Sequence, residues 1–294
     1  MLKKSILLEN KASLSTKNLQ LVIKTETRES TIPIEDIGFL VIDHPEIYLS
    51  IPAMNLMIEN NTSVIICNTN HLPNGMFLNL NSHHIQQEIF KNQINASAPL
   101  KKQLWQQTVV EKITNQGIFL QKITSKNNNF EFLASKVLSG DSSNMEGVAA
   151  SFYWKVFFEQ KFKRERFGDY PNNFLNYGYA ILRAATARAL SGSGLLNTLG
   201  IHHKSKYNAF ALADDIMEPF RPVVDEKVAE IMQNYTEQEL NTQIKAELLQ
   251  ILTRTVYFKD EKSPLMVALQ KTASSLQQCY TGDRKKIKYP KLWN

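Results

Sequence analysis

The 294-residue chain has little cysteine and no long hydrophobic run. Cys67 and Cys279 stand far apart, which excludes a disulfide framework and a tetrahedral zinc site and favours a reducing compartment. No segment approaches the roughly 18 consecutive apolar residues of a membrane span. The apolar run after Lys3 and Lys4 stops at Glu9, too early for a signal peptide. We therefore expect a cytoplasmic protein that makes no contact with a membrane.

The sequence also lacks internal repeats and low-complexity tracts. Its composition, 43% hydrophobic and 21% charged residues, is typical of a globular protein with a full-sized core. The formal net charge of +6 weakly favours an anionic partner, because many basic proteins bind no nucleic acid. Charge alone therefore leaves the partner open.

Residues 1–85 have the pattern of short strands separated by Asn, Asp, Gly and Pro. Pro52 near the first turn predicts one helix over residues 51–58, and Pro73 to Gly75 predicts a turn before a last strand at 77–80. The other predicted strands are 6–8, 19–24, 31–34, 39–42 and 63–67.

Beyond His84 the hydrophobic period changes from two to about 3.6, which is typical of amphipathic helices. Residues 86–98, with Asn95 to Pro99 at their end, have the composition of a linker. The sequence therefore predicts an α+β protein with a small N-terminal β-sandwich-like domain (1–85) and a larger all-α domain (99–294).

Acidic residues and histidines cluster in the second half of the chain. Asp215 and Glu218 are three residues apart, on one side of a helix that Pro219 would bend at a cost of about 3 kcal/mol. His202 and His203 precede them, and Glu146 begins an apolar helix. A carboxylate, an imidazole and a helix-borne carboxylate can hold a hard divalent metal against a phosphate backbone. A solvated acidic turn and a structural histidine are the alternative.

Several segments together resemble the CRISPR adaptation integrases. The chain length and the motif variants Asn-Tyr-Gly-Tyr (176–179) and Asp-Asp-Ile-Met-Glu-Pro (214–219) resemble those of type II systems. The segments are 141–150, 176–183, 194–195, 199–203 and 212–222. The resemblance implies a dimerisation role for the N-terminal β domain and a catalytic role for the helical one. It also implies that Glu146, His203 and Glu218 are the catalytic residues and bind Mg²⁺ or Mn²⁺, with Asp215 as an auxiliary acid. His202 remains an alternative to His203.

The activity implied by the resemblance is a metal-dependent transesterification that inserts short DNA fragments into a repeat array. Such a reaction needs no nucleophilic Ser, Tyr or Cys motif. Two alternatives remain open. The first is a metal-dependent endonuclease in which the same residues act on branched DNA with water as nucleophile. The second is a non-catalytic DNA-binding scaffold.

Basic residues near these carboxylates predict a DNA-binding surface, although they could equally decorate solvent-facing sides of helices. Tyr177 or Tyr179 could stack on a base, or pack in the core. The basic run 284–291 could bind DNA or be a solvated tail. The candidate DNA-binding residues are Lys155, Lys161, Lys163, Arg164, Arg166, Tyr177, Arg183 and Lys204.

The resemblance also implies the partners. These are double-stranded DNA, as fragment and as repeat array, and a second copy of the chain, paired through the N-terminal domain. A small ferredoxin-like CRISPR adaptation protein would bridge two such dimers into a heterohexamer.

Overall fold

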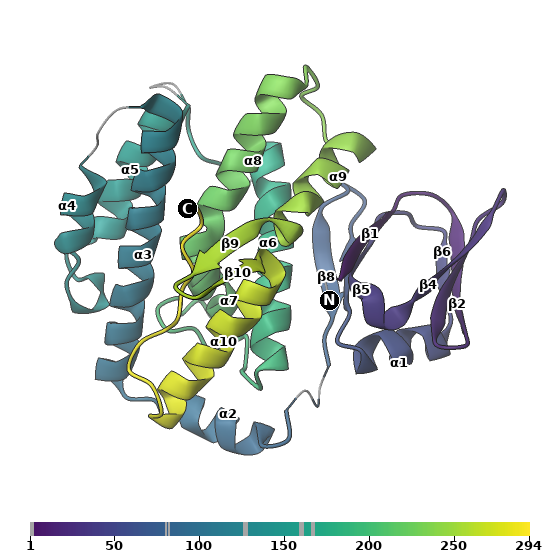
Figure 1. The fold of residues 1–294 in the computed structure, drawn as a ribbon, viewed down its shortest axis with the longest axis horizontal. Coiled ribbons are helices and arrows are strands. Elements are labelled where there is room, and N and C mark those ends of the chain that lie inside the picture. The colour runs from purple at the N-terminus through teal and green to yellow at the C-terminus, as the bar shows by residue number, and fades with distance from the viewer. Residues whose placement is uncertain (1–2, 80, 82, 126–128, 159–161, 166–167) are drawn as a thin grey trace. The chain divides into compact units, whose positions relative to one another are not determined.

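The computed structural model of the protein describes residues 3–79, 81, 83–125, 129–158, 162–165 and 168–294. The chain forms two compact units, Met1–His84 and Ile85–Asn294. The first is built mainly of strands and the second mainly of helices (Figure 1). The α+β class predicted from the change in hydrophobic period is thus confirmed.

The N-terminal unit consists of two four-stranded sheets. In the first sheet the order is β1-β5-β7-β8, with β8 antiparallel to β7 and the other pairs parallel. In the second the order is β4-β3-β2-β6. The bounds are β1 Lys4–Leu8, β2 Ala12–Lys17, β3 Gln20–Lys24, β4 Glu29–Pro33, β5 Ile37–Ile42, β6 Ile47–Leu49, β7 Ser63–Cys67 and β8 Pro73–Phe77.

The core of this unit is aliphatic. Leu14, Leu21, Leu40 and Val64 come from both sheets and belong to one buried cluster. Helix α1 (Ile51–Glu59) adds Ala53 and Met57 to it. Ser50 caps this helix by accepting a hydrogen bond from the Ala53 N–H, and Pro52 lies in its first turn, as the sequence predicts.

Two local expectations were wrong here. Residues 73–75, expected to form a turn, begin β8, because Pro73 is tolerated at the start of an edge strand that needs no N–H at that position. Strand β2 was not predicted, because Ser and Thr alternate with its few apolar residues.

The expected linker, residues 86–98, is also corrected. Helix α2 (Gln86–Ile94) occupies most of it and belongs to the helical unit. Ile89 is fully buried, and the Gln93 side chain bonds to the backbone of Leu196 and Leu199. Ser97 then caps the next helix, so the small and polar residues that resemble a linker are a helix start.

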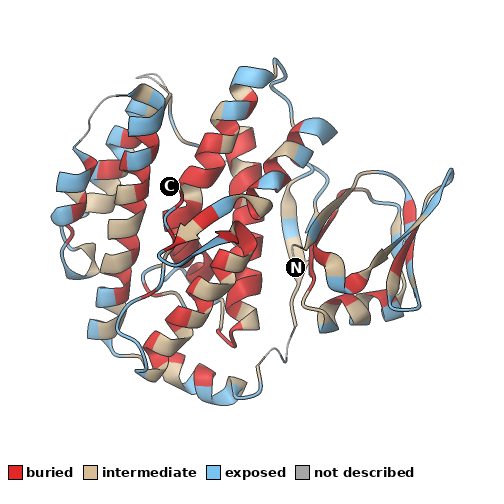
Figure 2. Cartoon of the chain, viewed as in Figure 1, coloured by how far each residue is buried: buried red, intermediate tan, exposed pale blue. Residues whose placement is uncertain are grey.

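The helical unit is organised around two long helices. Helix α3 (Ala98–Thr124) contacts α4, α5 and α8, and α6 (Asn172–Gly192) contacts α7, α8, α9 and α10. The buried residues concentrate on these facing surfaces (Figure 2). The other bounds are α4 Phe130–Ser135, α5 Met145–Phe157, α7 Ala211–Met217, α8 Arg221–Asn234, α9 Thr242–Leu249 and α10 Leu265–Thr281.

The helical unit also contains one antiparallel hairpin, β9 (Thr255–Phe258) and β10 (Glu261–Pro264), which the helical period did not predict. Over the described part of the chain, no helix is both long and apolar enough to cross a membrane.

Candidate metal and DNA site

Glu146 lies in the first turn of α5, where the backbone is fixed by an acidic cap. Asp141 accepts hydrogen bonds from the N–H groups of Met145 (2.8 Å) and Glu146 (3.0 Å). Gly147 beside it is closely packed, since a Cβ there would lie 2.8 Å from the Asn144 side-chain amide, which would have to move. The Glu146 side chain remains 30% exposed and can reach a ligand.

Glu218 begins a single turn of 3₁₀ helix (Glu218–Phe220) between α7 and α8. Its side chain is only 6% exposed. Arg221 Nε donates to Oε1 over 2.8 Å. Burial opposes ionisation, but Arg221 and Lys112 more than offset it and lower the pKa of Glu218 to about 2. Glu218 is therefore a carboxylate at neutral pH, although it is buried.

Lys112, on α3, joins the two glutamates. Its Nζ lies 2.5 Å from Glu146 Oε1 and 2.6 Å from Glu218 Oε2. Burial lowers the pKa of Lys112, but the charges of Glu218 and Glu146 outweigh burial and raise it. The approach to Glu218 lacks hydrogen-bond geometry, so the buried Oε2 accepts no hydrogen bond.

His203 is held by Asp215. Its Nδ1 lies 2.6 Å from Asp215 Oδ1, and this hydrogen bond, opposed by burial, raises the pKa of His203. Asp215 is fully buried and also accepts from the N–H groups of Ile201, His202 and His203. Because Nδ1–H donates to the carboxylate, Nε2 is the nitrogen left to bind a metal.

Asp215 thus holds both the ring and the backbone of His203. Helix α7 ends at Met217 and Glu218 starts the 3₁₀ turn that follows, and the two acids have different partners: Asp215 bonds to residues 201–203, whereas Glu218 pairs with Arg221 and Lys112. Gly200 allows the close approach around Asp215, since a Cβ at that position would lie 2.5 Å from the His203 carbonyl oxygen and 2.8 Å from Asp215 Oδ2.

His202 is held apart from its neighbour. Its ring stacks on Trp105 with 4.3 Å between centroids and 5° between planes. The two adjacent imidazoles therefore have different surroundings, and His203 alone is held by a buried carboxylate.

The three candidate ligands share one electrostatic neighbourhood. Lys112 connects Glu146 to Glu218, and the charge of Glu218 contributes to the raised pKa of His203. Over the described ranges, no three His, Cys, Asp or Glu side chains approach closely enough to hold a metal ion as they stand. The donor types fit Mg²⁺ or Mn²⁺, because Glu146 and the ionised Glu218 offer carboxylate oxygens on either side of Lys112 and His203 offers an imidazole oriented by Asp215.

Comparisons with known proteins bear on this arrangement. Residues 6–260 match the family model for the CRISPR associated protein Cas1. The chain is 36% identical, over 98% of its length and 96% of the relative's, to a CRISPR-associated endonuclease Cas1 of Neisseria meningitidis serogroup C (strain 8013). The chain belongs to the Cas1 family. The resemblance to CRISPR adaptation proteins found in the motifs is thereby confirmed.

Solved structures show the same fold. A Cas1 protein from Thermotoga maritima superposes with a TM-score of 0.75 at 18% identity, covering 95% of this chain and 97% of that one. A casposase bound to integration product superposes with a TM-score of 0.80 at 21% identity, covering 97% and 92%. At these identities the likeness concerns the fold alone.

The basic residues expected to bind DNA fall into two groups in this Cas1 family member. Lys155 and Lys204 are exposed, as is Lys163, which pairs with Glu165 over 3.0 Å. Arg164 and Arg183 are engaged within the protein instead, with Asn172 and Asn176 and with Asp214. Lys161 and Arg166 lie outside the described residues.

The aromatic candidates do not fit a role in DNA stacking. Tyr177 is fully buried and belongs to the core, which corrects its assignment as a DNA-binding residue. Tyr179 is also buried, and its hydroxyl donates to Asp225, as does that of Tyr153 at 2.6 Å. Burial raises the pKa of Asp225 to about 6, although both tyrosine hydroxyls oppose the rise.

The basic C-terminal segment is docked onto the helical unit. Tyr257 and Lys291 exchange two backbone hydrogen bonds of 2.8 Å, and Tyr289 bonds through its hydroxyl to Thr108 at 2.9 Å. Trp293 Nε1 donates to the buried Glu226. The alternative of a solvated tail is therefore wrong for this segment.

Sequence reasoning missed Lys112, Arg221 and Asp141. Lys112 lies four residues from both Thr108 and Gln116, on the same buried side of α3, and a lysine on that side was a signal for a buried ion pair. The spacing of Glu218 and Arg221, three residues apart, was a signal for the second ion pair. Asp141 had no signal of its own, because it acts from a left-handed backbone position that spacing does not reveal.

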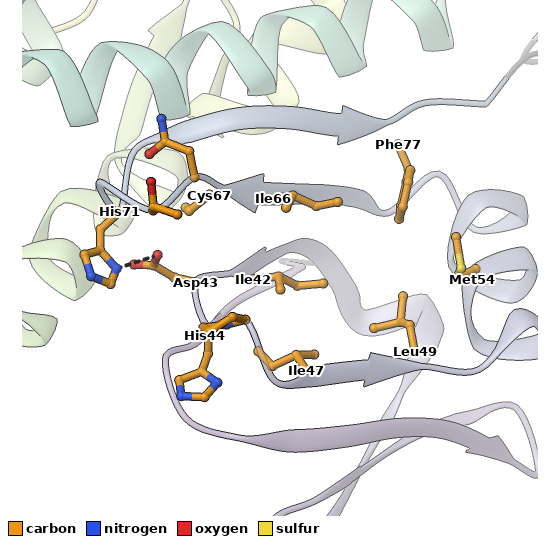
Figure 3. Close-up of a pocket in the computed structure, with 13 residues that line it drawn as sticks. Ile42, Asp43, His44, Ile47, Leu49, Met54, Ile66, Cys67, His71 and Phe77 are labelled. Carbon is orange, nitrogen blue, oxygen red and sulfur yellow. Dashed lines mark hydrogen bonds and ion pairs between the residues drawn. The ribbon is translucent and has the colours of Figure 1, made fainter.

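A separate cavity of about 520 Å³ lies in the N-terminal unit. Ile42, Ile66 and Phe77 line it beside Met54 of α1, and His71 reaches Asp43 at one end (Figure 3). None of the candidate metal ligands lines this cavity.

Proposed function

We propose that this Cas1 family protein inserts short double-stranded DNA fragments into a CRISPR repeat array by divalent-metal-dependent transesterification. The observation that carries the proposal is that Glu146 and Glu218 lie on either side of the buried Lys112 ammonium group, while Asp215 orients a histidine, His203, whose pKa the charge of Glu218 helps to raise. The relative in Neisseria meningitidis is named a CRISPR-associated endonuclease, and the casposase structure is described as bound to an integration product.

In the reaction, a fragment's 3′-hydroxyl attacks a phosphorus atom at the edge of a repeat. A new P–O bond forms and the P–O3′ bond of the target strand breaks. The proton lost by the attacking hydroxyl is balanced by the proton that the leaving 3′-oxygen gains. One phosphodiester replaces another, so the step needs neither a covalent enzyme intermediate nor an external energy source.

Glu146, His203 and Glu218 would hold Mg²⁺ or Mn²⁺, which polarises the phosphoryl oxygen and stabilises the leaving oxygen. Asp215 keeps the proton of His203 on Nδ1, so that Nε2 can bind. Asp141 fixes the backbone of Glu146. Arg221 keeps Glu218 ionised.

DNA would be held mainly through its phosphates. The exposed Lys155, Lys163 and Lys204 provide positive charge without buried partners, and Lys204 directly follows His203. Contacts of this kind orient a duplex but do not read its sequence.

We further propose the assembly expected from the family resemblance. The N-terminal β domain would pair two copies, and a small ferredoxin-like protein would join two such dimers. One solved structure with this fold (TM-score 0.75) is described as a Cas6-RT-Cas1--Cas2 complex, and another (TM-score 0.55) as a Cas1–DNA complex. A pair of copies would supply two metal sites, one for each end of a fragment.

The experiment is a joining assay with a labelled fragment, a supercoiled plasmid carrying the repeat, the small partner protein and Mn²⁺. Glu146→Gln, His203→Asn and Glu218→Gln should each abolish joined product while circular dichroism stays unchanged. Glu247→Gln, which alters a glutamate of α9 that pairs with Lys227 of α8, is the matched control and should retain full activity. Joining by any of the three site variants at the wild-type rate would overturn the assignment.

An endonuclease is the second candidate, because the Neisseria relative carries that name. The same groups could direct water instead of a 3′-hydroxyl to the phosphorus atom. The joining assay separates the two functions, since relaxed plasmid with a covalently attached label reports transfer, whereas shortened DNA without attached label reports hydrolysis. DNA binding with neither joined nor shortened product in the presence of Mn²⁺ would favour the non-catalytic scaffold.

A further inference from the structure

Lys112 occupies the space between the two candidate carboxylate ligands. Its side chain is 8% exposed, and its ammonium nitrogen lies within 2.5 to 2.6 Å of one oxygen from each glutamate. A bound Mg²⁺ would lie about 2.1 Å from carboxylate oxygens. A cation that bridges the same two oxygens would therefore nearly coincide with the ammonium nitrogen.

The charges around this point balance only with Lys112 in place. Glu146 and Glu218 supply two negative charges, and Lys112 and Arg221 supply two positive ones. Adding a divalent cation to all four groups would leave two unbalanced positive charges in a largely buried site, which is unfavourable. Removing the ammonium group from between the carboxylates relieves half of that excess.

The side chain has a route by which it can leave. The Glu146 side chain is 30% exposed, whereas that of Glu218 is 6% exposed. The site therefore opens to solvent beside Glu146. Lysine carries its charge on a flexible four-carbon stem that reorients readily. Arg221 is less free to follow, because its guanidinium group also packs over the Tyr179 ring, 4.5 Å from the centroid.

We propose that Lys112 is an internal cation that holds Glu146 and Glu218 together in the metal-free protein and that a divalent metal must displace. This inference rests on the proposed metal site and adds how that site is regulated. Metal affinity is lowered by the energy of the lysine ion pairs, so the site fills only when metal binding is strong enough to release Lys112.

The test is a Mn²⁺ titration of the full-length protein, followed by electron paramagnetic resonance. Lys112→Met keeps the length of the side chain but removes the charge, and should bind Mn²⁺ about tenfold more tightly than wild type. This factor corresponds to the low end of the free energies found when a buried charge pair is replaced by apolar groups. Lys112→Arg keeps the charge and should show no tightening. Lys122→Met is the matched control, since Lys122 lies on the same helix and pairs with Glu226 outside the site.

A thermal melt gives a second readout. In EDTA the Met variant should melt below wild type, because the buried Glu218 and the partly exposed Glu146 then face each other without the ammonium group, and Mn²⁺ should raise its Tm by more than it raises that of wild type. Lys112→Gln serves the same comparison if the Met variant does not fold.

The outcomes separate this inference from the proposed function. If Glu218→Gln abolishes Mn²⁺ binding but Lys112→Met binds as wild type or more weakly, the displacement idea is refuted and the metal site stands. If neither wild type nor any variant binds Mn²⁺ at millimolar concentration, both fail. Equal tightening in Lys112→Met and Lys112→Arg would also refute displacement.

Discussion

Replacing Asp215 by Asn should separate the positioning of His203 from metal ligation. The Asp215 carboxylate is fully buried and accepts four hydrogen bonds, from the N–H groups of Ile201, His202 and His203 and from His203 Nδ1. An asparagine offers one acceptor oxygen, and its NH₂ group would face donors. At least two of the four hydrogen bonds are therefore broken.

The size of the effect follows from these hydrogen bonds. Each buried donor left without a partner costs about 1–3 kcal/mol. Breaking two predicts that Asp215→Asn lowers the free energy of unfolding by about 2–6 kcal/mol, measured by urea titration. Joining activity per folded molecule should fall by about 10–100-fold, the usual effect of removing the partner of a metal-binding histidine.

A further readout distinguishes positioning from general destabilisation. Because the hydrogen bond from Asp215 raises the pKa of His203, the variant should show a lower His203 pKa by NMR titration of the imidazole. His203→Asn in the same background should remove the joining activity that remains, because His203 would still be the ligand in Asp215→Asn. An Asp215→Asn variant with wild-type stability and an unchanged His203 pKa would refute the reasoning.

Four other expectations follow from the structure. His202→Ala should reduce joining less than His203→Ala, because His202 stacks on Trp105 while His203 is held by a carboxylate; the reverse order in the joining assay would identify His202 as the ligand. Burial raises the folded-state pKa of Asp225 to about 6, above its ordinary value, so the unfolded state releases this proton first as pH rises. Relative to Asp225→Asn, wild type should therefore lose about 3 kcal/mol of stability between pH 3.5 and pH 7 in urea titrations. A stability difference between the two proteins that stays constant with pH would contradict this. DNA binding should weaken with salt, and glutamine variants at Lys155, Lys163 and Lys204 should lower the slope of log affinity against log salt by about 0.9 for each phosphate that is no longer neutralised; unchanged slopes would show that these lysines face away from DNA. The full chain should scatter light as a dimer at micromolar concentration and residues 85–294 alone as monomers or aggregates, whereas a monomeric full chain would contradict the paired-site assembly.

The cluster of candidate ligands was predictable because its residues stand in short motifs. Glu146, His203 and Glu218 were assigned from the resemblance of these motifs to a family, and in the structure Glu146 and Glu218 flank one lysine while the charge of Glu218 contributes to the raised pKa of His203. The role of Asp215 was not predictable, because spacing places it beside Glu218, while its actual partners are backbone N–H groups of residues 201–203.

The surface residues show the limit of composition. Arg164 and Lys163 are neighbours in the chain and look alike in a basic cluster. In the fold, Arg164 donates to Asn172 and Asn176, and Lys163 lies in solvent with Glu165. Tyr177 and Tyr179 likewise look like aromatic platforms, but their helix turns them into the core. Side-chain burial on a helix depends on which neighbours cover it, and no local pattern encodes that.

Hydrophobic period and contiguous motifs were enough to predict the α+β class, the change from strands to helices near His84 and the family, because both are properties of short segments. The folded chain was needed to show that Lys112 of α3 lies between carboxylates from α5 and the turn before α8. It was also needed to show that residues 86–94 are a packed helix and that the basic C-terminal segment is docked. These features depend on interactions between residues far apart in the chain, and such interactions exist only after the helices have packed.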